Sequence, residues 1–195
     1  KIFSVEFMIK LIKTAKLNSN EVIHDRVNSI DQLWTNRPVE KKKKFFFLKK
    51  KIYGLSTKKK IKIIFENHKY DHFILSSSDS ICWLLNIRGY DLNETPITFL
   101  RMILSRKKIK LFVDLEKVPR IKEKNDILYY DINRFSDHII KIPKKSSILL
   151  DNSTSYYYYN FMKEHGFSFT VSEDPCKLIK SIKNPIKIKN TILAH

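Results

Sequence analysis

Residues 79–91 read Asp-Ser-Ile-Cys-Trp-Leu-Leu-Asn-Ile-Arg-Gly-Tyr-Asp, and the fold can be worked out from this stretch. Its first half is apolar around Trp83, which predicts a short helical segment packed on a hydrophobic core. Its second half becomes polar around Gly89, one of only three glycines in 195 residues. A glycine kept in a composition that otherwise avoids it indicates a backbone need. We therefore expect Gly89 to end the helical segment with a positive or otherwise strained φ.

The polar half of this stretch supplies the candidate site residues, which are Asn86, Arg88, Gly89 and Asp91. A sharp exit at Gly89 would place Arg88 and Asp91 on an exposed loop at the edge of a sheet, close to a substrate. Under a second interpretation, Arg88 and Asp91 pair with each other or with the backbone and only fix the loop. In both interpretations Trp83 is a core residue rather than a ligand contact.

Helical and strand patterns alternate on both sides of this stretch. Helical periodicity marks the segments 5–15, 56–68, 135–141, 156–165 and 174–182. Short apolar runs predict strands at 21–23, 72–76, 98–104, 109–114, 127–131, 147–150 and 167–171. Residues 28–51, which include a lysine run at 41–44, indicate a linker that crosses between two domains. The alternation predicts an α/β fold in which a mixed β-sheet is flanked by helices.

Several kinds of catalytic chemistry have no counterpart in the sequence. Three scattered glycines cannot form a glycine-rich phosphate loop, and there is no HExxH pair and no nucleophile elbow. His68, Asp71 and His72 are the one grouping that could suggest a metal cluster, but a surface pair with ordinary partners is the favoured interpretation. We therefore predict no catalytic residue and no metal ligand in this chain.

The formal net charge of +18 raises the possibility of a nucleic-acid partner. Of the 38 basic residues only seven are Arg, the side chain that forks onto phosphates and guanine edges. The four tyrosines at 156–159 cannot share one helix face, so core packing is favoured over a base-stacking platform. We expect no sequence-specific nucleic-acid partner, and at most weak, charge-driven binding that is lost near physiological salt.

Two features bear on where the protein resides. Cys82 and Cys176 are far apart and form no CxxC pair, which favours a reducing cytoplasm. No apolar run approaches the ~20 residues needed to span a bilayer, so we expect no membrane partner.

Two long stretches carry a resemblance to a known family. Residues 28–38 read Asn-Ser-Ile-Asp-Gln-Leu-Trp-Thr-Asn-Arg-Pro, which is similar to the segment joining the first two domains of long Xaa-Pro aminopeptidases (aminopeptidase P). Residues 79–91 resemble that family's Asp-Glu-Ile-Ala-Trp-Leu-x-Asn-Leu-Arg-Gly-x-Asp. The Leu-Phe-Val-Asp run at 111–114 and Lys183-Asn184 follow in the family's order. Together these stretches resemble the peptidase M24 and creatinase N-terminal family, of the three-domain type.

The resemblance implies a division of the chain and marks some departures. Residues 1–27 would be the end of a preceding α/β domain, 28–182 the linker and a creatinase N-terminal-like domain, and 183–195 the start of a helix leading into a catalytic domain that is missing. Departures from the family pattern occur at Asn36, Tyr90, Thr95 and in the linker helix at 186–189.

The resemblance also implies a function. The full enzymes remove the N-terminal residue before proline with two divalent metals, commonly Mn, that are held in the catalytic domain. This chain would shape the mouth of the active site and support subunit contacts. Its partners would be the catalytic domain, a second copy in a homodimer, and peptide substrate bound by the full enzyme. Alternatives are a stand-alone peptide- or protein-binding module of the same fold, or a weak charge-driven nucleic-acid binder.

Overall fold

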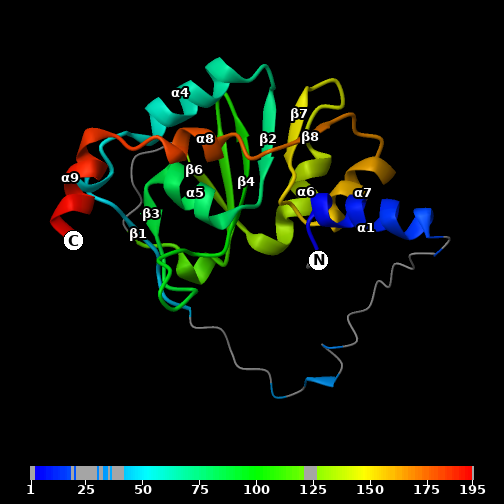
Figure 1. The fold of residues 1–195 in the computed structure, drawn as a ribbon, viewed down its shortest axis with the longest axis horizontal. Coiled ribbons are helices and arrows are strands. Elements are labelled where there is room, and N and C mark those ends of the chain that lie inside the picture. Colours follow the sequence, from blue (N-terminus) through cyan, green and yellow to red (C-terminus); the bar gives the residue numbers. More distant parts are fainter. Residues whose placement is uncertain are drawn as a thin grey trace.

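The computed structural model describes residues 3–18, 20, 30, 33–34, 36, 42–120 and 127–194 (Figure 1). Most of the stretch 28–38 and the strand expected at 21–23 lie outside the described residues. The helices are α1 (Val5–Leu17), α3 (Lys50–Tyr53), α4 (Thr57–Asn67), α5 (Ser78–Leu85), α6 (Phe135–Ile140), α7 (Tyr156–Glu164), α8 (Cys176–Ser181) and α9 (Pro185–Ala194). The strands are β1 (Phe46–Phe47), β2 (His72–Leu75), β3 (Ile87–Arg88), β4 (Arg101–Ser105), β5 (Ile109–Val113), β6 (Ile127–Asp131), β7 (Ile148–Asp151) and β8 (Thr170–Ser172).

The main sheet has six strands in the order β6-β5-β4-β2-β7-β8. Strand β4 runs antiparallel to both neighbours, β2 and β5, while the pairs β5–β6, β2–β7 and β7–β8 are parallel. A separate two-stranded sheet pairs β1 with β3. The sheet is therefore mixed, and with helices on its two faces it confirms the predicted fold class (Figure 1).

Alternating side chains of the central strands build one core on each face of the sheet. In β2, Phe73 and Leu75 belong to the core under α4, α5 and α8, whereas Ile74 belongs to the core under α1, α6 and α7. The same alternation holds in β4, where Met102 and Ile103 point to opposite faces. Strands buried on both faces read as continuous apolar runs, which is how they appear in the sequence.

Short side-chain caps and one glycine fix where the longer helices begin and end. Ser4, Ser56 and Ser155 each accept a backbone hydrogen bond at the start of α1, α4 and α7. Gly166, with φ of +68°, follows the last turn of α7, as its position in the sequence indicates. The predicted helices at 5–15, 56–68 and 156–165 are confirmed to within two residues.

Two predicted strands begin later than expected. β4 starts at Arg101 rather than at Thr98, because the backbone before it is bonded by side chains instead of by a neighbouring strand. Phe99 N donates to the Asp91 carboxylate at 2.7 Å, and Leu100 N donates to the Ser78 hydroxyl at 3.2 Å. β8 is likewise confined to Thr170–Ser172.

The segment expected to be a linker is partly built into the domain. Of residues 42–51, Phe45 is buried in the core and Phe46–Phe47 pair with β3. The described lysines of the 41–44 run are exposed, as expected. At the other end, α1 packs on this same domain, with Val5 fully buried and its amide bonded to the Thr154 carbonyl at 2.8 Å.

The tyrosine run lies partly in the core. Tyr158 is buried in the core under α7, while Tyr157 is exposed, which confirms core packing for part of the run. No helix in the described part of the chain is long and apolar enough to cross a membrane.

Candidate functional site

Helix α5 ends at Asn86, not at Gly89. Asn86 takes the left-handed conformation, with φ of 56° and ψ of 38°. Its backbone N–H caps the helix. Asn tolerates this conformation because its short side chain can hydrogen-bond locally. Here the side chain is buried, donates to the Leu55 carbonyl at 3.2 Å, and accepts from Lys60 at 2.5 Å. Asn86 is one of the residues expected on a substrate-proximal loop, but its side chain is buried and bonds partners inside the fold.

Gly89 is required for lack of space rather than for an unusual φ. Its φ lies outside the left-handed region, so the predicted positive φ is wrong. A Cβ at this position would lie 2.5 Å from the Thr98 Cβ and 2.9 Å from the Ile97 carbonyl oxygen. The Gly89 amide also donates to the Pro96 carbonyl at 3.3 Å. The segment before β4 therefore lies directly on Gly89, and only glycine permits this approach.

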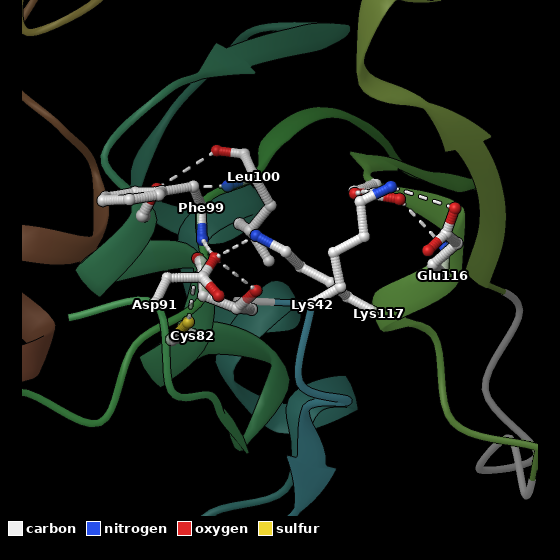
Figure 2. Close-up of polar contacts among 10 residues, drawn as sticks. Lys42, Cys82, Asp91, Phe99, Leu100, Glu116 and Lys117 are labelled. Carbon is white, nitrogen blue, oxygen red and sulfur yellow. Dashed lines mark hydrogen bonds and ion pairs between the residues drawn. The ribbon is translucent and has the colours of Figure 1, made fainter. Parts of the chain in front are cut away.

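Asp91 is the centre of a buried ion pair. Its Oδ2 lies 2.9 Å from Lys117 Nζ, and both side chains are 3% exposed. The same oxygen accepts from Thr98 Oγ1 at 3.0 Å and from Phe99 N at 2.7 Å (Figure 2). The first interpretation, an exposed Asp91, is wrong, because the carboxylate turns inward to bind the segment before β4. The second interpretation is confirmed in part, since Asp91 bonds a backbone amide and not Arg88.

Lys117 links this cluster to the strand β1 region. It lies in the short helical turn Leu115–Lys117, and its carbonyl accepts from Phe45 N at 3.0 Å. In the same turn, Glu116 pairs with Lys42 at 2.9 Å (Figure 2). These contacts hold residues 42–47 beside the candidate site, where β1 pairs with β3.

Arg88 lies in strand β3 and is half-buried, so it is not on a loop as expected. Its partner in the strand register is Phe46. Its Nη1 donates to the carbonyl of Ile87 at 2.7 Å and to that of Cys82 at 3.5 Å. Arg88 therefore has a fixed guanidinium that bonds the backbone and not Asp91.

Two lysines that the sequence analysis missed complete the site. Lys60 is 1% exposed, donates to the Trp83 carbonyl, and lies 4.3 Å from the centre of the Trp83 ring. Lys187, from α9, lies 5.4 Å from the centre of the same ring. Trp83 itself is 6% exposed, which confirms its place in the core.

Burial and like charge act together on these lysines. Burial lowers the pKa of Lys60 to about 7, and repulsion from Lys187 and Arg88 adds to this. Burial also lowers the pKa of Lys187 to about 8, with Lys183 and Arg88 contributing repulsion. One feature of the sequence could have indicated that Lys60 is buried. It lies on the buried face of α4 together with Thr57 and Ile64. For Lys117 no local pattern distinguishes it from the many exposed lysines.

The described residues offer neither a metal centre nor an activated nucleophile. They bring together no group of three or more His, Cys, Asp or Glu side chains that could hold a metal ion. Asp71 instead accepts from the Ser147 amide and hydroxyl, both at 2.8 Å, and these bonds lower its pKa. Burial raises the pKa of Cys82 to about 11 and that of Cys176 well above its usual value, so both remain thiols.

The residues of the candidate site can position and bind a partner, and they offer hydrogen-bond donors. Arg88 and Lys187 are half-buried cations that repel each other, Lys187 lies near the Trp83 ring, and the Trp83 Nε1 has no acceptor among the described residues. Asn86, Gly89 and Asp91 fix the backbone on which Arg88 is carried. Such a site can orient a neighbouring chain or an anionic group, but it contains no residue set for bond cleavage.

Comparison with known proteins gives a consistent match. Residues 36–187 match the creatinase/prolidase N-terminal domain family. An Xaa-Pro aminopeptidase of Drosophila melanogaster is 29% identical over 86% of this chain and 29% of its own length. Xaa-Pro aminopeptidase 1 of Dictyostelium discoideum is 30% identical over 81% of this chain and 26% of its own. The chain thus spans less than a third of the length of these relatives.

A solved structure shows the same fold. The X-prolyl aminopeptidase of Caenorhabditis elegans, described as a cytosolic enzyme with a di-nuclear active site, superposes with a TM-score of 0.83 at 21% identity. The superposition covers 96% of this chain and 32% of the enzyme. The sequence matches and the fold agree, and the chain therefore belongs to the creatinase/prolidase N-terminal domain family, as an N-terminal domain of the Xaa-Pro aminopeptidase type.

Proposed function

We propose that this chain is the non-catalytic N-terminal and middle region of an Xaa-Pro aminopeptidase, in which it shapes the mouth of the active site and supports subunit contacts. The observation that carries the proposal is that the alignments include most of this chain but only a small part of each relative. Alignments that take in 81–86% of this chain take in only 26–29% of the two relatives. The catalytic function then belongs to the part of such an enzyme that this chain does not match.

Within this proposal, Arg88 is the residue nearest the substrate, and its neighbours position it. Asn86 and Asp91 have their side chains bonded inside the fold, and Gly89 is packed against Thr98. Arg88 remains half-buried on β3, beside the half-buried Lys187 at the start of α9. A fixed cation at this position can orient a peptide through its carbonyl or carboxylate oxygens.

The partners and the location follow from the same proposal. The partners are a catalytic region with two divalent metals, commonly Mn in this family, and a second copy of the chain. The C. elegans enzyme with its di-nuclear active site supports the metals. Two free, buried cysteines and the description of that enzyme as cytosolic support a cytoplasmic location.

A chimeric enzyme tests the proposal. The matched region of the Drosophila enzyme is replaced by this chain, and kcat/KM is measured on an Xaa-Pro peptide. We expect turnover, and we expect Arg88→Ala to lower kcat/KM by roughly ten- to a hundredfold, since one charge-assisted hydrogen bond contributes ~1.5–3 kcal/mol. Arg134→Ala is the matched control, because Arg134 is exposed and its ion pair with Asp137 is also at the surface. A folded but inactive chimera, or equal effects of the two variants, would contradict the proposal.

A further inference from the structure

A cleft with a strongly basic rim lies between helix α4 and the hairpin that joins β4 to β5. Its volume is about 300 Å³, a size within the lower range of small-molecule sites. Five of its lining residues are cations, namely Lys58, Lys62, Arg106, Lys107 and Lys108. We call this feature the basic cleft. It contains none of the four candidate-site residues, so it is independent of the proposed function.

The tip of the hairpin is held rigidly. Ser105 N donates to the Lys108 carbonyl at 3.0 Å, and the Ser105 hydroxyl both donates to that carbonyl and accepts from Lys108 N, each at 3.1 Å. The Arg106 guanidinium lies 4.8 Å from the centre of the Phe65 ring, which fixes its plane. The backbone of the hairpin tip and the Arg106 side chain are therefore ordered before any ligand binds, which reduces the entropy lost on binding.

Among the described residues, few carboxylates oppose these cations. Lys62 pairs with Glu66 at 3.7 Å, but both side chains are more than half exposed, so this pair is weak. Asp71, which interacts with Arg106, already accepts two hydrogen bonds from Ser147. Concentrated cations with so few carboxylates attract an anion of high charge.

The floor of the cleft is apolar. It is formed by Ile61 from α4 and Ile109 from β5, with the buried Thr57 at one side. An apolar floor under a cationic rim suits a ligand that has an organic part as well as several negative charges. A nucleic-acid strand would need a groove that continues along its backbone, whereas this cleft is a single concavity.

We propose that the basic cleft binds a small phosphorylated molecule of the nucleoside di- or triphosphate class. The phosphates lie among Arg106, Lys107 and Lys108 at the hairpin tip and Lys58 on α4. The base and sugar lie over Ile61 and Ile109.

Calorimetric titration of the chain with ATP, inorganic triphosphate and adenosine tests the proposal. We expect ATP to bind, triphosphate to bind more weakly, and adenosine to give no signal. The variant Lys58→Gln/Arg106→Gln/Lys107→Gln should weaken ATP binding at least tenfold. Its matched control is Lys10→Gln/Lys13→Gln/Lys16→Gln, which removes the same charge from exposed positions of α1 and should change the affinity less than twofold.

Three results would overturn the proposal. They are no ATP binding at millimolar concentration, an equal loss in the two variants, and a single-stranded RNA oligonucleotide that displaces ATP and depends on the same cations. A thermal melt checks that each variant is folded. If the triple variant does not fold, Arg106→Gln/Lys107→Gln alters only the exposed hairpin tip and should still weaken ATP binding severalfold.

Discussion

The polar residues of the stretch 86–91 and those of the basic cleft have opposite environments. Asn86 and Asp91 are turned inward and bonded to buried partners, whereas Arg106 and Lys107 are exposed and face few carboxylates of the described residues. The first group holds strands and turns in place, and its polarity serves the fold. In the second group, Arg106 contacts the Phe65 ring at the surface, but it takes part in no ion pair of the described residues. A polar residue in a distinctive motif is therefore no evidence of an exposed site, and the variants below separate the two cases.

The largest effect is expected at the buried ion pair. Asp91→Asn removes the carboxylate charge that lies 2.9 Å from the buried Lys117 Nζ, which should lower the free energy of unfolding by about 3–5 kcal/mol. Urea denaturation measures the change. The control Glu173→Gln breaks a pair in which both side chains are 70% exposed, and it should cost less than ~1 kcal/mol. Equal costs for the two variants would show that Asp91 is not a structural centre.

The next largest effect is expected at Gly89, and a comparison with Gly166 separates steric crowding of an added Cβ from backbone strain. Gly89→Ala forces a Cβ against Thr98 and should cost about 2–3 kcal/mol. Gly166→Ala meets no atom within 4 Å but must keep a φ of +68°, so it should cost about 1 kcal/mol. The same denaturation assay compares them. A Gly89 variant that is more stable than the Gly166 variant would contradict the close approach of residues 97–98.

The buried Lys60 predicts a dependence on pH. Its pKa falls from 10.5 unfolded to about 7 folded, so above pH 7 the unfolded chain binds more protons than the folded chain. Stability should therefore rise between pH 7 and 8.5, by up to ~1.4 kcal/mol per pH unit. Above this range the raised pKa values of the two cysteines act in the opposite direction. Lys60→Met should reduce the slope of stability against pH. An unchanged slope would assign the pH dependence to Lys187 alone.

The smallest effect on stability is expected at Arg88. Arg88→Ala removes bonds to two carbonyls from a half-buried side chain, so it should cost below ~1 kcal/mol in urea denaturation. A loss of 3 kcal/mol or more would make Arg88 a structural clamp like Asp91. It would also remove the reason for placing it near a substrate.

The sequence predicted the architecture well because hydrophobic patterns depend on local spacing. Continuous apolar runs such as Leu149–Leu150 mark strands buried on both faces, and Ser56 and Gly166 mark helix ends. The candidate site was predicted poorly because its contacts join distant segments. Nothing near Asp91 indicates that Lys117 lies against it, and nothing near Gly89 indicates the approach of Thr98. Trp83 was placed correctly because an aromatic residue in an apolar helix has few other positions.

The role assigned to the whole chain can be checked with one assay. The isolated chain is incubated with Mn and an Xaa-Pro peptide, with and without a chelator, and the released amino acid is measured. We predict no release above the blank, because the described residues offer no metal-binding group and no activated nucleophile. Robust turnover that the chelator abolishes would contradict the assignment of this chain as the non-catalytic part of an Xaa-Pro aminopeptidase.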